Sequence, residues 1–117
     1  MNKRKTGAEY EKLAAEWLMQ HGFQILEYNY RCRQGEIDLI AREGAALVFV
    51  EVKYRKNGQT GDPSEAVDIR KQKKISRVAL YYCWEKKVPQ ETPCRFDVIS
   101  IKGESIRQMK DAFPYIG

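Results

Sequence analysis

Charged residues inside two otherwise apolar segments are the feature that most constrains this chain. Between Gly35 and Tyr54 two apolar runs flank Arg42-Glu43-Gly44, a pattern that predicts two strands and a tight connection. Strands of this composition are usually buried on both faces of a sheet. A charge within such a strand needs a partner, a metal ion or an opening to solvent. The segment therefore predicts the centre of a sheet and the position of a polar site.

Side chains alternate between the two faces of a strand, so spacing predicts which residues share a face. In the second strand Glu51 and Lys53 are predicted to lie on the face of Leu47 and Phe49. The two faces of the first strand are predicted to be Glu36, Asp38 and Ile40, and Ile37, Leu39 and Ala41.

Asp38 and Glu51 can converge on one hard cation, since their strands are neighbours. Mg²⁺ is usually held by one or two carboxylates and keeps waters and phosphate oxygens as its other ligands. Lys53 points the same way as Glu51 and can position an attacking water, a set that fits metal-assisted hydrolysis of a phosphodiester. The alternative is an ion pair between Glu51 and Lys53, with Asp38 only marking a strand end.

Length and composition limit the class of protein. With 117 residues we expect one domain over 1–117, of which residues 1–6 form a loose basic tail. The longest apolar run, 45–50, is far too short to span a membrane, and no signal peptide is expected. Three cysteines at scattered spacing argue against a disulfide framework or a zinc site and suit a reducing cytoplasm.

The remaining elements are predicted from periodicity. A helix is expected over 7–21, with Glu11 at the margin of its apolar stripe and His21 as a cap. A strand is expected over 23–30, a helix start at Asp62, a longer helix over 68–86 and a strand over 95–101, in which Asp97 is expected to pair with a basic group or to support the site. Ile106, Met109 and Phe113 have helical spacing.

Basic residues cluster at three places, which suits a polyanionic partner together with a formal charge of +5. Each cluster has an alternative interpretation as an ordinary solvated surface. The clusters are a turn with Arg31 and Arg33, a loop with Arg55 and Lys56, and a helical ridge of Arg70, Lys73, Lys74 and Arg77.

The order of elements, with Asp and Glu-x-Lys on the middle strands, resembles the restriction-endonuclease-like superfamily and its (Asp)…(Asp/Glu)-x-Lys signature, PD-(D/E)xK. The blocks at 29–31, 35–41, 48–53 and 95–98 look like the YraN-like family of predicted bacterial nucleases, which is similar to archaeal Holliday junction resolvases. The resemblance implies an α/β fold with a central mixed sheet flanked by helices.

The resemblance also implies roles for individual residues. Asp38 and Glu51 would bind Mg²⁺, or Mn²⁺ as a substitute, with the Val52 carbonyl as a further ligand. Lys53 would be the catalytic lysine, and Glu11 would complete the acidic cluster. Gln72 and Lys73 match a Lys-Gln-Lys stretch of the family. The chain departs from the family in having Tyr10 where Gly often precedes the helix glutamate.

Two functions follow as expectations. The first is a Mg²⁺-dependent endonuclease acting on DNA, including branched or structured DNA, which a homodimer would engage symmetrically. The second is a non-catalytic nucleic-acid-binding module on the same fold. Three charges kept in apolar strands argue for the first, because a module that only binds has no need of them.

Overall fold

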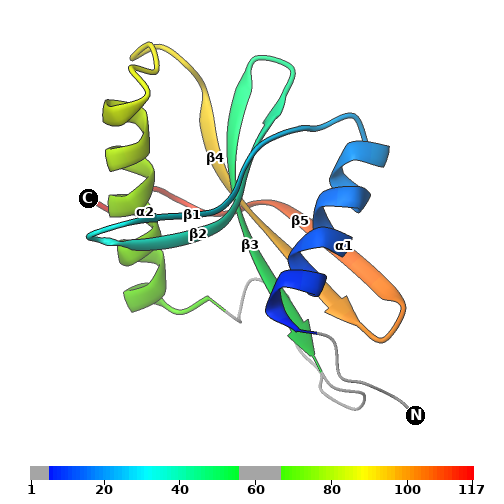
Figure 1. The fold of residues 1–117 in the computed structure, drawn as a ribbon. Coiled ribbons are helices and arrows are strands. Elements are labelled where there is room, and N and C mark those ends of the chain that lie inside the picture. Colours follow the sequence, from blue (N-terminus) through cyan, green and yellow to red (C-terminus); the bar gives the residue numbers. More distant parts are fainter. Residues whose placement is uncertain (1–5, 56–66) are drawn as a thin grey trace.

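Five strands form one mixed sheet in the order β1-β2-β3-β4-β5, with a helix on each face (Figure 1). The computed structural model describes residues 6–55 and 67–117. Its elements are α1 (Gly7–Gln20), β1 (Gln24–Cys32), β2 (Gly35–Glu43), β3 (Ala46–Arg55), α2 (Ile69–Glu85), β4 (Cys94–Lys102) and β5 (Ser105–Phe113). The predicted α/β architecture, a central mixed sheet flanked by helices, is confirmed.

The only parallel pair among the described strands is β3–β4, and the chain between them includes α2. Parallel neighbours need such a crossover, whereas β1–β2, β2–β3 and β4–β5 are antiparallel hairpins with short connections. β3 therefore lies in the middle of the sheet, as its nearly continuous apolar sequence predicts.

Two hydrophobic cores lie on opposite faces of the sheet. Ala14, Ala15 and Leu18 of α1 pack on one face, with Val48 and Val50 of β3. The other face packs against α2 through Ile75, Val78, Ala79 and Tyr82, together with Leu47 and Phe49 of β3. The predicted assignment of β3 side chains to its two faces is therefore confirmed.

Both helices begin and end with polar caps. The Thr6 hydroxyl accepts a hydrogen bond from the Glu9 N–H at 3.2 Å, so Thr6 belongs to the helix cap and not to the predicted tail. His21 caps the C-terminal end of α1, as predicted. Asp68 caps α2 by accepting from the Lys71 N–H at 2.8 Å. The predicted helix start at Asp62 and the tail at 1–5 lie outside the described residues.

The prediction that Ile37 shares a face with Leu39 and Ala41 is wrong. Ile37 packs in the core under α2, whereas Leu39 and Ala41 pack under α1. The strand is irregular here, because the β2–β3 ladder ends at Leu39–Val50. In β1, Asn29 has a left-handed φ of 50° at this level of the hairpin. The hairpin tip reaches toward α2 (Figure 1), and Ile37 accordingly packs with the core residues of that helix.

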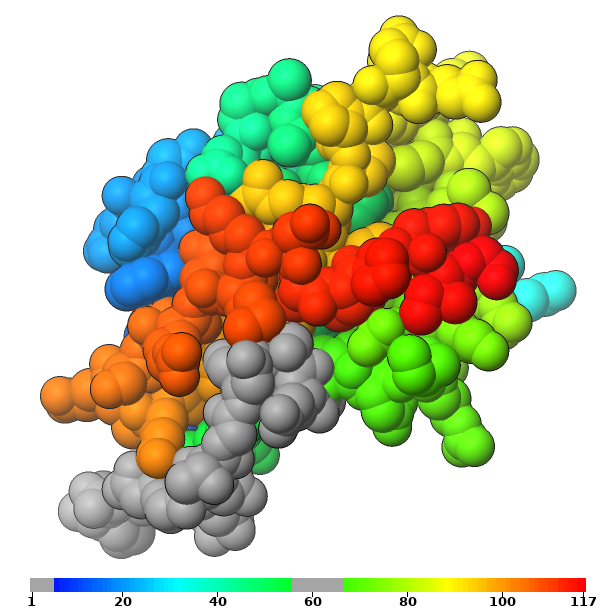
Figure 2. All heavy atoms as spheres, turned by 180° about the vertical axis from the view of Figure 1, so that it is seen from behind, coloured from blue at the N-terminus to red at the C-terminus, as the bar shows by residue number. Residues whose placement is uncertain are grey.

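The helical spacing of Ile106, Met109 and Phe113 is also misleading, because these residues lie in β5. Figure 2 shows β5 and the C-terminal residues crossing the back of the molecule between α1 and α2. A register shift opposite Phe96–Val98 and a left-handed φ of 54° at Asp111 interrupt the alternation. Ile106 therefore packs with the α1 core and Phe113 with the α2 core. The interrupted alternation leaves these apolar residues at a spacing that resembles a helical repeat.

Neither described helix is both long enough and apolar enough to cross a membrane.

Candidate functional site

Asp38 joins the two strands of the motif through its side chain. Its carboxylate accepts a hydrogen bond from the backbone N–H of Val52 at 2.7 Å. The β2–β3 ladder has ended two residues earlier on β3, at Val50, so the carboxylate takes the place of a ladder partner. Asp38 is thereby held beside Glu51, which lies between Val50 and Val52 on β3.

Glu51 is almost completely buried, with 5% of its surface exposed, in the middle of the sheet. The Lys71 ammonium of α2 lies 3.3 Å from Glu51 Oε2, an ion-pair distance. This contact lacks hydrogen-bond geometry, and Oε2 accepts no hydrogen bond from any residue in the described part of the chain. A buried carboxylate oxygen without a donor is costly, so this atom needs a proton or a cation.

Burial is the largest cause that raises the pKa of Glu51 from 4.5 to about 8, and the neighbouring Asp38 carboxylate acts in the same direction. The positive charges of Lys71 and Lys53 oppose that rise. Two carboxyl groups that share one site cannot both ionise without a counter-charge. The pair therefore favours a bound proton or a bound cation at neutral pH.

Glu11 of α1 lies close enough to Asp38 and Glu36 for their charges to act on it. Burial raises its pKa, and the charges of Asp38 and Glu36 add to the effect. Tyr10 stacks on Tyr54 with ring centroids 4.3 Å apart, which fixes the N-terminal part of α1 against the end of β3. Tyr10 in place of the family's glycine thus leaves Glu11 near the site.

The acidic cluster is looser than the resemblance implies. No group of three or more His, Cys, Asp or Glu side chains within residues 6–55 and 67–117 is close enough to hold one metal ion. Glu36, which shares the strand with Asp38, forms an exposed ion pair with Arg31 at 3.2 Å. Asp38 and Glu51 are therefore the two described carboxylates best placed for a metal, and Mg²⁺ needs no more than two.

Lys53 and Val52 flank the pair on β3. Lys53 is half-buried, lies opposite Ser100 of β4, and its charge acts on Glu51. Val52 contributes its N–H to Asp38. The Val52 carbonyl as a metal ligand stays a prediction.

Lys71 is the residue that sequence reasoning missed. Its ammonium contacts the motif glutamate, yet the predicted basic ridge includes Arg70 and Lys73 on either side of it and omits Lys71 itself. A signal was present, because Lys71 lies four residues before Ile75 and so continues the buried stripe of α2. A lysine on the core-facing side of a helix indicates a buried anion nearby.

The predicted nucleic-acid residues fall into separate groups. Arg70, Lys73, Lys74 and Arg77 are all exposed on α2, so the predicted ridge exists as a basic surface. Gln72 points elsewhere, because its side-chain amide donates to the Val67 carbonyl at 2.9 Å. Arg33 is exposed in the β1–β2 turn, beside Arg31. Arg55 is the last residue of β3 and lies opposite Lys102 of β4. Lys56 lies outside the described residues.

A cleft of about 380 Å³ separates the β1–β2 hairpin tip from α2. It is lined by Arg31, Cys32, Gly35, Glu36, Lys71 and Lys74. Gly35 has a φ of 146°, and a Cβ there would meet Lys74 Cγ at 3.1 Å and Val78 Cγ2 at 3.3 Å. A glycine is therefore required for the hairpin to approach α2 this closely. The cleft brings the turn arginine, part of the ridge and Lys71 together.

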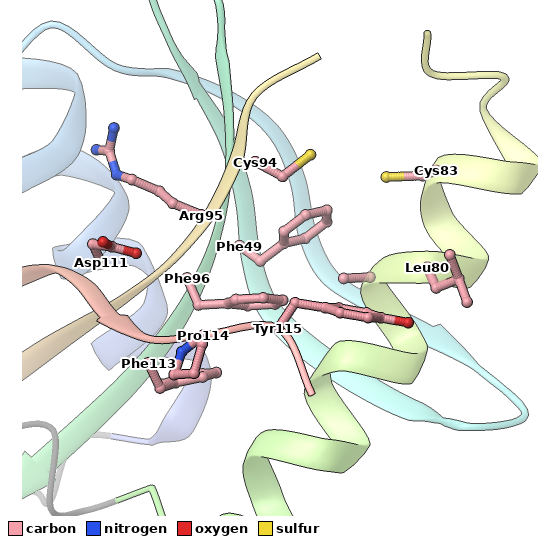
Figure 3. Close-up of a pocket in the computed structure, with 11 residues that line it drawn as sticks. Phe49, Leu80, Cys83, Cys94, Arg95, Phe96, Asp111, Phe113, Pro114 and Tyr115 are labelled. Carbon is pink, nitrogen blue, oxygen red and sulfur yellow. The ribbon is translucent and has the colours of Figure 1, made fainter. Parts of the chain in front are cut away.

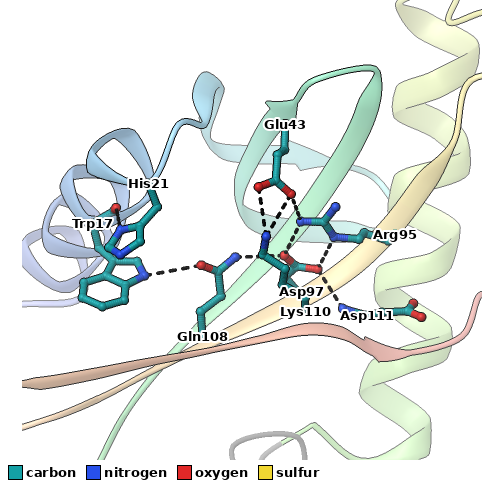
Figure 4. Close-up of polar contacts among 8 residues, drawn as sticks. All are labelled: Trp17, His21, Glu43, Arg95, Asp97, Gln108, Lys110 and Asp111. Atoms are coloured by element: carbon teal, nitrogen blue, oxygen red, sulfur yellow. Dashed lines mark hydrogen bonds and ion pairs between the residues drawn. The ribbon is translucent and has the colours of Figure 1, made fainter.

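Asp97, for which the sequence left two roles open, pairs with a basic group (Figure 4). It is completely buried, and its carboxylate accepts from Arg95 Nε at 2.9 Å, from Gln108 Nε2 at 3.0 Å and from the Asp111 N–H at 3.0 Å. Arg95 also donates to Glu43 at 2.7 Å. This network ties β4 to β5 and to the end of β2, and it includes none of Asp38, Glu51 and Lys53.

A second cavity, of about 220 Å³, lies between α2, β4 and the C-terminal residues (Figure 3). Its walls are mainly apolar side chains, among them Phe49, Leu80, Phe96, Phe113 and Tyr115. It contains none of the motif residues and is separate from the candidate site.

Comparison with known proteins agrees on one family. The model of the uncharacterised protein family UPF0102 matches residues 10–101, which include every motif residue from Glu11 to Asp97. The chain belongs to the UPF0102 family. A UPF0102 protein of Lachnoclostridium phytofermentans is 51% identical over 117 residues, covering 100% of this chain and 99% of that protein.

More distant UPF0102 proteins match over most of their length as well. Those of Photobacterium profundum and Syntrophus aciditrophicus are both 45% identical, over 88% and 93% of this chain and 83% and 88% of their own. The sequence similarity thus covers more than four fifths of each of these two relatives.

Proposed function

We propose that this UPF0102 protein is a metal-dependent endonuclease of the restriction-endonuclease-like, PD-(D/E)xK type that hydrolyses phosphodiester bonds in DNA. The observation that carries the proposal is Glu51, a buried carboxylate whose Oε2 accepts no hydrogen bond from the described residues while a second carboxylate, Asp38, stands beside it. A divalent cation would satisfy both groups.

Asp38 and Glu51 would hold Mg²⁺, or Mn²⁺ in its place, with Glu11 close enough to assist through its charge. When bound, the metal supplies Lewis-acid stabilisation and lowers the pKa of a bound water. Asp38 keeps its geometry through the Val52 N–H. Lys53, on the face of Glu51, would orient the attacking water or offset the charge that builds on the phosphate.

The basic surface supports DNA as the substrate. Exposed cations on α2, with Arg31 and Arg33 in the hairpin turn, would contact phosphates and not base edges. We therefore expect weak sequence preference and steep salt dependence of binding. Branched or otherwise structured DNA, engaged by a homodimer, is the finer form of this proposal, because two copies would present two such surfaces.

A non-catalytic nucleic-acid-binding module is the second candidate. The observation that favours it is the ion pair between Lys71 and Glu51, which balances the buried charge without a metal. In that case the motif carboxylates would serve stability alone.

Cleavage separates the two candidates. A labelled four-way junction, a matched linear duplex and a single strand are each incubated with Mg²⁺, Mn²⁺ or chelator. The wild-type protein is compared with Glu51→Gln and with Glu16→Gln, a matched change on the exposed face of α1. Metal-dependent cutting that is lost only in Glu51→Gln supports the nuclease. Binding without cutting by the wild type supports the module, and neither activity rejects both.

A further inference from the structure

Lys71 contacts the candidate metal site and also lines the neighbouring cleft. Its ammonium lies 3.3 Å from Glu51 Oε2, inside the candidate metal site, and its side chain also lines the cleft between the hairpin tip and α2. The side chain is 39% exposed, in contrast to 5% for Glu51. Lys71 is therefore a solvent-accessible cation that reaches a buried carboxyl group from the wall of an open cleft.

The other charges of the cleft are arranged differently. Arg31 is paired with Glu36 at 3.2 Å, both largely exposed. Lys74 has no ion pair or hydrogen bond with any residue that the structure describes, and its side-chain carbons pack over Gly35. With Lys71 engaged by Glu51 and Arg31 by Glu36, Lys74 supplies the one uncompensated positive charge on the described cleft wall.

We propose that Lys71 is the resident counter-ion of the metal site, and that a divalent metal displaces it into the cleft, where it binds a phosphate group of the nucleic acid strand. The inference rests on the proposed function, since it concerns the same site. It assigns the cleft as a subsite for a phosphodiester next to the one that is cleaved.

Electrostatics gives the direction of this exchange. A divalent ion at Glu51 would place two positive charges where Lys71 now contributes one, and the two cations would repel each other. The Lys71 side chain is long and partly in solvent, so it can turn about its own bonds into the cleft without unfolding α2. A phosphate held beside Lys74 offers the released ammonium a new anion.

Metal and nucleic acid would therefore bind with positive coupling, each strengthening the other. Without metal, Lys71 is held by Glu51 and adds little to nucleic acid affinity. With metal bound, the cleft gains one cation. In this order, with metal first and phosphate second, the protein would bind nucleic acid tightly only after the metal ion is bound.

The test compares wild type with Lys71→Met, Lys71→Arg and Lys87→Met, a control that removes the same charge from an exposed residue beyond the other end of α2. Mn²⁺ binding is measured by calorimetry without DNA. Binding of a labelled DNA duplex is measured by fluorescence anisotropy against salt, in chelator and in Ca²⁺. Circular dichroism establishes that each variant is folded.

We expect Lys71→Met to bind Mn²⁺ tighter than wild type, by on the order of fivefold, since it lacks the competing cation. Its slope of log affinity against log salt should fall by about one in Ca²⁺ and stay unchanged in chelator, because one phosphate contact is lost only in the metal-bound protein. Lys71→Arg and Lys87→Met should bind Mn²⁺ as wild type does.

Two results would overturn the inference. Mn²⁺ affinity that is unchanged or weaker in Lys71→Met would show that Lys71 does not compete with the metal. A salt slope reduced equally in chelator and in Ca²⁺ would show that Lys71 contacts phosphate without being displaced. Either result leaves the nuclease proposal standing if wild type cuts DNA. A wild-type protein that binds neither Mn²⁺ nor DNA removes both.

Discussion

The Asp38 carboxylate accepts a hydrogen bond from the Val52 N–H at 2.7 Å, so the acidic residue of one strand closes a gap in the ladder of the next. One side chain thus serves the sheet and the candidate metal site together. Substitutions at Asp38 should separate these two roles.

Asp38→Asn keeps a side-chain oxygen that can accept from Val52, whereas Asp38→Ala leaves that N–H without a partner. We expect Asp38→Ala to lose about 1.5–3 kcal/mol of unfolding free energy, the usual contribution of a hydrogen bond to a charged group, and Asp38→Asn to lose less. Both should lose metal-dependent cleavage. Urea unfolding and the junction-cleavage assay measure the two effects, and an active Asp38→Asn enzyme would contradict the assignment of Asp38 to the metal.

The stability of the protein should depend on the protonation of Glu51. Burial and the neighbouring Asp38 carboxylate raise the pKa of Glu51 from 4.5 to about 8, so between these values the native state binds more protons at this group than the unfolded chain does. The contribution of Glu51 to the free energy of unfolding should therefore be greatest below about pH 4.5. It should fall as the pH rises from 4.5 to about 8.

Urea unfolding from pH 5 to 9 measures this slope, and Glu51→Gln is the control. The glutamine cannot ionise, so the fall in stability should be much smaller. A small fall in the same direction should remain because of Glu11, whose pKa is also raised. Mg²⁺ should flatten the wild-type profile, since it stabilises the ionised carboxylate. A slope that is equal in both proteins would mean that Glu51 is not the group responsible.

Gly35 should be intolerant of a side chain. Its φ of 146° and the 3.1 Å approach of a Cβ to Lys74 Cγ combine strain with a steric conflict. We expect Gly35→Ala to cost about 1–3 kcal/mol and to weaken DNA binding by moving the hairpin tip away from α2. Gly44→Ala is the control: its φ of 58° is also left-handed, but a Cβ there meets nothing within 4 Å. Equal loss of DNA binding in both would contradict a role for the cleft.

Glu11→Gln tests whether the first helix contributes to the site. The pKa of Glu11 is raised by burial and by the charges of Asp38 and Glu36, so removing its charge should relieve repulsion and leave stability equal or slightly higher. Mn²⁺ affinity should fall, by on the order of fivefold or more. Glu16→Gln, on the exposed face of the same helix, should change neither quantity. Calorimetry that shows identical Mn²⁺ binding in all three proteins would exclude Glu11 from the site.

Most of the fold could be predicted from periodicity, because buried stripes and alternating strands leave direct marks in the sequence. The failures have local causes. Ile37 changes face where the β1–β2 hairpin bends. The bend depends on how β2 packs against neighbouring elements, so the sequence of β2 alone does not predict it. In β5, the irregularity at Asp111 breaks the alternation, so three apolar residues acquire helical spacing. Gly103 at the first position of the two-residue turn between Lys102 and Ser105 was the available signal for a hairpin.

The candidate site could be predicted as far as its strands, since Asp38, Glu51 and Lys53 stand out as charges in apolar segments. The partner of Glu51 could not be predicted in the same way. Lys71 comes from a separate helix, and its contact depends on how α2 packs across the sheet. Two signals indicated it: the continuation of the buried stripe by one turn, and its place as the first lysine of the Lys-Gln-Lys stretch at 71–73. Glu36 was similarly undecided from spacing, and its ion pair with Arg31 depends on the geometry of the turn.

The parallel pairing of β3 with β4 has a consequence for how the site assembles as the protein folds. Asp38 and Val52 are 14 positions apart and belong to one hairpin, whereas Leu47 of β3 pairs with Cys94 of β4 across the whole α2 crossover. Contacts that are close in sequence form faster than distant ones. We therefore expect pulsed hydrogen exchange to protect β2 and β3 before β4. The two carboxylates would then meet early in folding, and remain without their lysine until α2 docks.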